Sequence, residues 1–161
     1  EGSPNVDSLL WFTINVLPLI EKEISNIKLY VVGDYSASSL FTIDKANIVF
    51  KGRLEKVDEM YNQCRVFLAP TRFAAGIPHK VHEAAAMGIP AVTTNLLAQQ
   101  LQWDHGKELL SGITVEEFSQ QCIRLYRDPK VWSRIREGGL KAVKNDCSDS
   151  KFDSTIKLLF S

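Results

Sequence analysis

The stretch RVFLAPTRFAAGIPHKVHEAAAMGIPAVTT, residues 65–94, decides the fold of this chain. It opens with a β-branched and aromatic run over residues 65–69 and closes with a second such run over residues 91–94. Between them, residues 78–87 follow a helical pattern, and Gly88 comes next as a typical C-terminal cap. Two buried strands joined by a helix predict a parallel crossover, which is the repeating unit of an α/β sheet.

The same alternation continues on both sides of this stretch. Upstream lie a helix that we expect Asn5 to cap and Pro18 to kink, then strands at residues 28–33 and 47–50 and a helical segment over residues 54–64. Downstream lie a short helix near residues 96–101, a short strand around Leu109, and helical segments at residues 115–126, 130–144 and 150–160. The pattern predicts a single α/β domain over residues 1–161, built on a doubly wound parallel sheet, with a helical closing segment from about residue 114 to residue 161.

Composition narrows the class of protein. The chain has 161 residues, of which 45% are hydrophobic, enough for one ordinary core. Its 19 basic residues balance its 19 acidic residues, so no overall field attracts nucleic acid or an anionic membrane. We therefore expect no nucleic-acid partner, and any bound anion must meet a local site.

Cysteine usage and hydropathy point to a location. Cys64, Cys122 and Cys147 form no CxxC pair, and three unpaired thiols fit a reducing cytoplasm better than a disulfide framework. No apolar run approaches the roughly 20 residues of a membrane helix, so we expect no transmembrane segment, while peripheral membrane contact of a longer protein stays open. The chain begins at Glu1 rather than methionine, which favours a fragment of something longer.

The richest loop for chemistry follows the strand at residues 65–69. It delivers Gly76 and Pro78 to the start of a helix, where free backbone N–H groups and the helix dipole attract anions. Lys80 and Glu83, three residues apart, share one face of that helix. A lysine there neutralises a phosphate, and a carboxylate accepts hydrogen bonds from the two hydroxyls of a ribose. The alternative for this pair is a solvent-facing salt bridge.

These residues together resemble the signature of GT4-type, group 1 glycosyltransferases. The matching positions are Pro70, Arg72, Gly76, Lys80, the run EAAAMG over residues 83–88, Pro90 and the run VTT over residues 92–94. The resemblance extends to about Leu110 and implies a Rossmann-like fold, the C-terminal, nucleotide-sugar-binding domain of a GT-B enzyme. In that family the glutamate at the position of Glu83 binds the ribose of the nucleotide.

The sequence departs from the family pattern at two places. Many members carry a second glutamate where this chain has Ala75, which leaves backbone groups or His79 to contact the donor sugar. The arginine and lysine that clamp the diphosphate in many members have no evident counterpart. Arg53 beside Gly52, together with Lys51, and Arg72 are the candidate substitutes, and ordinary surface charge is the alternative for each.

The resemblance implies a retaining transfer of a sugar from a nucleoside diphosphate donor, with no cofactor and no metal. Lys80 and the amides of residues 76–79 would stabilise the departing diphosphate. An N-terminal domain of the same protein would bind the acceptor, so the isolated piece would be inactive. Two alternatives stay open: a non-catalytic interaction module with the same half-fold, and a sugar-nucleotide epimerase of GT-B shape. A dinucleotide-binding domain is disfavoured because no G-x-G-x-x-G follows a predicted strand.

Overall fold

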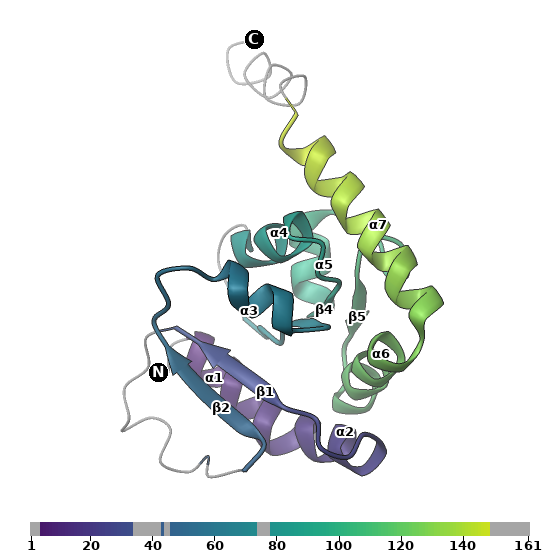
Figure 1. Cartoon of the computed structure of the whole chain (residues 1–161). Helices are drawn as coiled ribbons and strands as arrows, with labels where there is room; N and C mark the ends of the chain where they lie inside the picture. Colours follow the sequence, from purple (N-terminus) through teal and green to yellow (C-terminus); the bar gives the residue numbers. More distant parts are fainter. Residues whose placement is uncertain (1–3, 34–42, 44–45, 74–77, 149–161) are drawn as a thin grey trace.

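The computed structural model describes residues 4–33, 43, 46–73 and 78–148, and its secondary structure alternates helices and strands (Figure 1). The first part runs α1 (Pro4–Trp11), a π-helical segment η1 (Phe12–Val16), α2 (Leu17–Glu23), β1 (Leu29–Val32), β2 (Ile48–Gly52), α3 (Asp58–Gln63) and β3 (Phe67–Ala69). The second part runs α4 (His79–Ala86), β4 (Ala91–Thr94), α5 (Asn95–Leu101), β5 (Leu110–Gly112), α6 (Val115–Arg127) and α7 (Pro129–Asp146).

All strand pairs among these elements are parallel, which confirms the α/β class. The strands are hydrogen-bonded in two groups, β1 with β2 and, in a second group, β3 with β4 and β4 with β5. Figure 1 shows the first group beside α1 and α2, and the second beside α5 and α6. The two groups follow from pairing between distant segments, which the pattern of residues along the chain does not specify.

One hydrophobic core joins the two groups of strands. Its members include Phe12 from the first helical segment, Ile48 from β2, Val92 from β4 and Phe118 from α6, all of them buried. Phe12 and Phe118 meet edge to face, with ring centroids 6.0 Å apart. This core packs the first helical segment and β2 against β4 and α6.

The first helix differs in detail from the expectation. Asn5 does not cap it, because α1 already includes Pro4, a residue suited to the first turn of a helix. Pro18 lies in α2 directly after the π-helical segment Phe12–Val16. A proline has no N–H to donate to the preceding turn, and the wide π-helical turn accommodates that loss.

The closing helices lie where the pattern placed them. Thr114 caps α6: its hydroxyl accepts from the Glu117 N–H at 3.1 Å, and the Glu117 carboxylate accepts from the Thr114 N–H at 3.3 Å. Asp128 caps α7 by accepting from the N–H groups of Lys130 and Val131. The helix expected over residues 150–160 lies outside the described residues.

Candidate functional site

The carboxyl end of β3 leads toward α4. The loop between them includes Ala75 and Gly76, which lie outside the described residues, so the amides expected there are not placed. At the near end of the loop, the Thr94 hydroxyl donates to the Thr71 carbonyl at 2.6 Å and ties this loop to the end of β4. The two loops that leave β3 and β4 are therefore held together.

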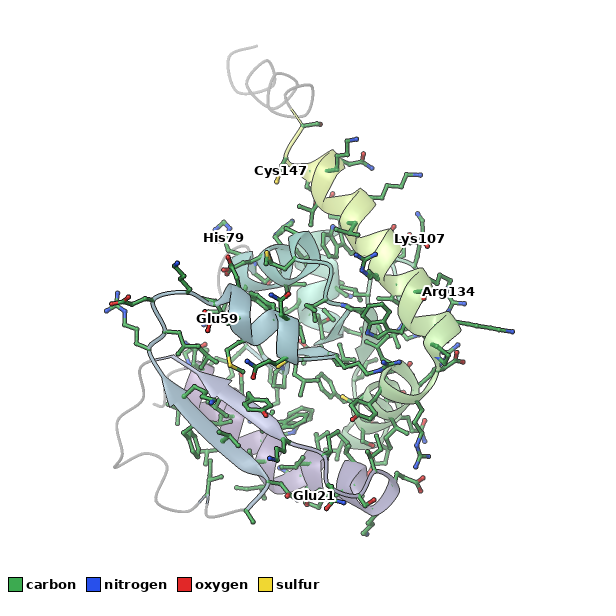
Figure 2. The ribbon with its side chains drawn as sticks, in the orientation of Figure 1. Glu21, Glu59, His79, Lys107, Arg134 and Cys147 are labelled. Carbon is green, nitrogen blue, oxygen red and sulfur yellow. The ribbon has the colours of Figure 1, made fainter. Side chains whose placement is uncertain are left out.

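The N-terminus of α4 has no cap from the described part of the chain. Pro78 at the cap position has no side-chain hydrogen bond to offer, and no acidic residue lies in the first turn. The Val81 N–H donates to the Pro78 carbonyl, whereas the preceding N–H groups of His79 and Lys80 have no acceptor within the helix. His79 and Lys80 are both exposed, and Figure 2 shows His79 projecting from the start of α4. This end of the helix is suited to an anion.

Lys80 and Glu83 are both exposed on α4 and do not form an ion pair. Among the described residues, neither side chain has a hydrogen-bond or ion-pair partner, so the alternative of a solvent-facing salt bridge is not what the structure contains. Because Lys80 and Glu83 do not pair with each other, both side chains are available to bind a ligand.

Behind Glu83 lies a buried phenol that sequence reasoning had treated only as part of a helix. Burial of Tyr61, reinforced by the nearby charges of Glu83 and Asp58, raises the pKa of its hydroxyl to about 12. Tyr61 therefore stays neutral and offers a weakly acidic hydroxyl near the Glu83 carboxylate. The sequence predicted that Tyr61 lies in a helical segment over residues 54–64, but not that it lies near Glu83 of α4.

A cavity of about 1150 Å³ brings most of the predicted residues together. One end of the cavity lies at the carboxyl ends of β1, β2 and β3, where an α/β sheet ordinarily binds its ligand. The residues that line this end include Gly33, Arg53, Pro70, Thr71, His79, Lys80 and Glu83. The lining thus contains Arg53, Lys80, His79 and Glu83 from the predicted site, but neither Gly52 nor Arg72.

Gly52 shapes the approach to Arg53. Its φ of +65° is in the left-handed region that favours glycine, and it follows the exposed Lys51 at the end of β2. The Lys51 ammonium lies over the Tyr30 ring, 5.8 Å from its centroid. Lys51 is therefore directed onto β1, and Arg53 is the cation from this strand end that lines the cavity.

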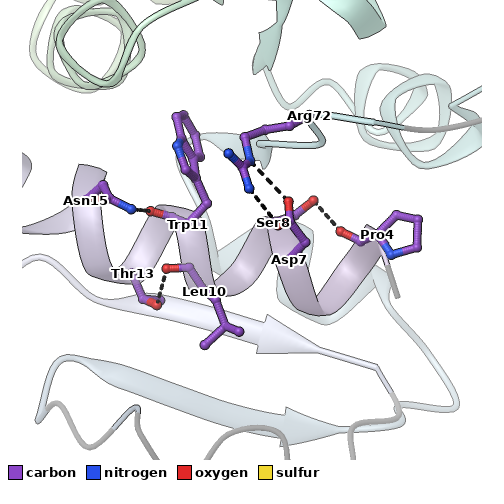
Figure 3. Close-up of polar contacts among 8 residues, drawn as sticks. All are labelled: Pro4, Asp7, Ser8, Leu10, Trp11, Thr13, Asn15 and Arg72. Atoms are coloured by element: carbon purple, nitrogen blue, oxygen red, sulfur yellow. Dashed lines mark hydrogen bonds and ion pairs between the residues drawn. The ribbon is translucent and has the colours of Figure 1, made fainter. Parts of the chain in front are cut away.

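Arg72 has a partner that the sequence did not reveal. Its Nη2 donates to Asp7 Oδ1 at 2.6 Å and its Nε to Asp7 Oδ2 at 3.1 Å, while its guanidinium lies over the ring of Trp11 (Figure 3). Asp7 is 65 residues away in the chain, so no local spacing rule signals the contact. Arg72 fastens the β3–α4 loop to α1.

No group of three or more His, Cys, Asp or Glu side chains in the described part of the chain is arranged to hold a metal ion. None of the described helices combines the length and apolar character needed to cross a bilayer.

Comparison with known proteins gives a family and a fold. The family model described as "Glycosyl transferases group 1" matches residues 2–128. A curated protein from Klebsiella pneumoniae, described as an uncharacterized 44.6 kDa protein in the cps region, is 20% identical over 94% of this chain and 42% of its own length.

Two solved structures resemble the chain. A mutant of TarM from S. aureus, in complex with fondaparinux, alpha-GlcNAc-glycerol and UDP, superposes with a TM-score of 0.78 at 13% identity, over 100% of this chain and 34% of TarM. HepE from Anabaena, in complex with UDP and glucose, superposes with a TM-score of 0.73 at 12% identity, over 90% of this chain and 43% of HepE. At these identities the likeness shows a Rossmann-like GT-B fold. The chain spans less than half the length of each of these relatives.

Proposed function

Since the chain belongs to the glycosyl transferases group 1 family, we propose that it is the nucleotide-sugar-binding half of a retaining glycosyltransferase. The observation that carries this proposal is the placement of Lys80 and Glu83. Both are exposed side chains of α4 that line a cavity at the carboxyl ends of three strands, and neither has a partner among the described residues. In this proposal, one helix would present a cation, a carboxylate and backbone amides to a single ligand.

Each group has a role that matches one part of a nucleoside diphosphate sugar. The Lys80 ammonium and the N–H groups at the start of α4 would bind the diphosphate and stabilise the negative charge that develops as the glycosidic bond breaks. The Glu83 carboxylate would accept hydrogen bonds from the two ribose hydroxyls. In this proposal the donor, not a bound cofactor or metal, carries the reacting group.

The remaining predicted residues are assigned to the rim of the site. Arg53 would add a second cation to the diphosphate, with Gly52 permitting the turn that brings it there, and His79 together with the backbone near Gly76 would contact the sugar. Arg72 would join only after exchanging Asp7 for phosphate, because its guanidinium is already engaged by that carboxylate.

The acceptor half is assigned to the rest of a longer protein. The chain covers 34% to 43% of the length of these three relatives, so most of their length has no counterpart in it. We propose that an N-terminal domain binds the acceptor and closes the cleft, and that the isolated chain binds nucleotide with little turnover. The three cysteines are free thiols, which supports a cytoplasmic location.

Calorimetric titration of the chain with UDP, GDP and ADP tests the proposal. We expect one nucleotide to bind, and Glu83→Ala and Lys80→Ala each to weaken it by about 1 to 3 kcal/mol, the usual cost of losing a charged hydrogen-bond partner. Glu137→Ala and Lys144→Ala are matched controls, because both residues are exposed on α7 and neither lines the cavity. Circular dichroism of each variant confirms that the fold is intact.

The other outcomes select among the alternatives. Absence of binding at millimolar concentration, or equal losses in the α7 controls, contradicts the donor-site proposal and favours a non-catalytic interaction module. Conversion of a sugar nucleotide to its epimer by the longer protein, without an acceptor, would favour an epimerase.

A further inference from the structure

A polar contact outside the cavity joins α4 to the end of α7. Asp146 is the last residue of α7, and its Oδ2 accepts a hydrogen bond from the Trp103 indole N–H at 2.9 Å. The same oxygen lies 3.1 Å from His82 Nε2, which donates, because an ionised carboxylate can only accept. We call His82, Trp103 and Asp146 the Asp146 joint. None of the three residues lines the cavity that holds the candidate site.

Each member of the joint belongs to a different part of the fold. His82 lies in α4 between Lys80 and Glu83, whereas Trp103 follows the end of α5. Trp103 is only 6% exposed and belongs to a buried cluster of apolar residues. The joint is therefore anchored in the core through Trp103, and α4 is attached to that anchor through His82.

We propose that Asp146 is a positioning residue of the donor site. Through the joint it holds α4 at one angle about the helix axis and so sets the direction of Lys80 and Glu83. The inference rests on the proposed function, because it takes these two side chains as ligands of the nucleotide. The attachment of α4 to α7 does not depend on that function.

The apolar packing of α4 determines its angle only weakly. Two of its buried residues, Ala84 and Ala85, are alanines. Gly139 of α7 faces Ala85, since a Cβ added at Gly139 would lie 3.4 Å from the Ala85 Cβ. Side chains this small let the two helices approach closely, side by side in Figure 1, but they interlock little. A hydrogen bond depends on direction, so the joint fixes an angle that these apolar contacts leave loose.

The surroundings of the joint keep it rigid. The side chains of His82 and Asp146 are each 20% exposed, so the contact between them is partly shielded from water. The His82 ring also meets the Trp103 ring in a T-shaped contact, with centroids 5.2 Å apart and an interplanar angle of 77°. Packing against the indole holds the imidazole in the orientation that the carboxylate requires.

A small rotation of α4 is enough to affect ligand binding. Side chains end about 5 to 6 Å from a helix axis, so a rotation of about 10° moves their tips by about 1 Å. His82 directly precedes Glu83 and lies two residues after Lys80, so it constrains the helix at the donor residues themselves. At the other end of this segment, Pro78 makes no side-chain hydrogen bond to α4. Loss of the joint would therefore displace both proposed ligands of the nucleotide.

Hydrogen exchange without nucleotide tests the attachment of α4. Asp146→Ala removes the acceptor, whereas Asp146→Asn retains a carbonyl oxygen that can accept both hydrogen bonds. The Met87 amide, which donates to the Glu83 carbonyl, reports on α4, and the Phe118 amide, which donates to the Thr114 carbonyl, reports on α6. We expect the ratio of the Met87 rate to the Phe118 rate to rise about fivefold in Asp146→Ala. The ratio should stay unchanged in Asp146→Asn.

Asp128→Ala is the matched control for both measurements. The Asp128 carboxylate also accepts two hydrogen bonds, from the N–H groups of Lys130 and Val131, but at the opposite end of α7. Its loss should lower stability without changing the ratio of the two exchange rates or the affinity for nucleotide.

Calorimetric titration with UDP, GDP and ADP tests the effect on the donor site. We expect the dissociation constant of the nucleotide that binds to rise about fivefold in Asp146→Ala, because its binding groups are displaced by about 1 Å. Asp146→Asn should bind as tightly as the unmodified chain. In the unmodified chain, the same nucleotide should shift the nuclear magnetic resonance signal of the Trp103 indole N–H, a measurement that needs no variant.

Several outcomes overturn the proposal. An unchanged exchange ratio in Asp146→Ala overturns it whether or not a nucleotide binds, and so do equal effects in Asp128→Ala, which would indicate a general loss of stability. Faster exchange with unaltered affinity, or a Trp103 signal unmoved at saturating nucleotide, also overturns it, since α4 would then not link Asp146 to the ligand. If the unmodified chain binds none of the three nucleotides, the donor site fails, and the exchange ratio alone decides whether Asp146 positions α4.

Discussion

The Arg72 guanidinium binds the Asp7 carboxylate in a two-point contact, with donor–acceptor distances of 2.6 Å and 3.1 Å, and so joins the β3–α4 loop to the first helix (Figure 3). Their side chains are 46% and 24% exposed, which limits the stabilisation to the range of partly solvated ion pairs. A double-mutant cycle with Asp7→Asn and Arg72→Gln, followed by urea unfolding, should give a coupling free energy of about 0.5 to 1 kcal/mol. The more exposed pair of Arg127 and Glu23 serves as the comparison. A coupling of zero would mean that the contact adds nothing in solution.

The same contact makes a prediction about nucleotide affinity. If Arg72 contributes to the diphosphate site, Asp7→Asn should free it and tighten nucleotide binding about two- to fivefold, the equivalent of a lost surface ion pair. The measurement is calorimetric titration with the nucleotide that the unmodified chain binds. Glu23→Gln, which breaks an ion pair whose two residues do not line the cavity, should leave the affinity unchanged. If Asp7→Asn also leaves it unchanged, Arg72 only fastens the loop.

The phenol of Tyr61 reports the charge of Glu83. Burial raises its pKa to about 12, and the charges of Glu83 and Asp58 add to the shift. Ultraviolet titration should show a late-titrating tyrosine signal that disappears in Tyr61→Phe, and the pKa of Tyr61 should fall in Glu83→Gln. Because the folded pKa exceeds the unfolded value of 10.0, the contribution of Tyr61 to stability is fully present below pH 10 and is lost as pH rises toward 12. A tyrosine titration unaffected by Glu83→Gln would contradict the proximity of the two groups.

Two adjacent glycines in α7 should respond in opposite ways to the same substitution. A Cβ at Gly138 would overlap the carbonyl oxygen of Lys107, whereas a Cβ at Gly139 would meet Ala85 and Glu108 at 3.4 Å, an ordinary contact. Gly138→Ala should lower the free energy of unfolding by about 1 to 3 kcal/mol through overpacking. Gly139→Ala should be neutral or raise it by up to about 1 kcal/mol, because alanine favours a helix. Equal effects in denaturant unfolding would contradict the close approach of α7 to the turn at Lys107.

The cap of α6 is a local feature with a measurable energy. Thr114→Ala removes the acceptor for the Glu117 N–H and should lower the free energy of unfolding by about 1 kcal/mol, while Thr114→Ser should retain most of it. Hydrogen bonds from the N–H groups of Ile113 and Thr114 lower the pKa of the Glu117 carboxyl below its ordinary 4.5. The stability that Glu117 adds is therefore present above that pH and lost as pH falls through the lowered pKa. An alanine variant as stable as the unmodified chain would contradict this cap.

Local signals predicted the elements well where they were strong. The strand Ala91–Thr94 was predicted at its observed bounds, because its β-branched residues stop where a helical pattern begins. Gly88 adopts the positive φ that is expected of a C-terminal cap. Val115–Arg127 follows its apolar period to within a residue of the expectation. The π-helical segment before Pro18 was missed, because periodicity distinguishes a helix from a strand but not one helical pitch from another.

The candidate site likewise has one part that the sequence predicted and one part that depends on how the elements pack together. Lys80 and Glu83 share a helix, so their spacing of three residues was enough to place them on one face. Their lack of a mutual ion pair, and the position of Tyr61 behind Glu83, depend on how α3 packs beside α4. The pairing of Arg72 with Asp7 depends on two segments 65 residues apart.

The sequence by itself determined the order of strands and helices, their parallel class, and the helix that presents a lysine and a glutamate. These features are set by interactions within a few residues, which composition and spacing record directly. Only the tertiary structure decided which strand edges pair and which cations line the cavity. Such contacts join residues tens of positions apart, and their free energy depends on the packing of the whole core, which no local pattern of residues specifies.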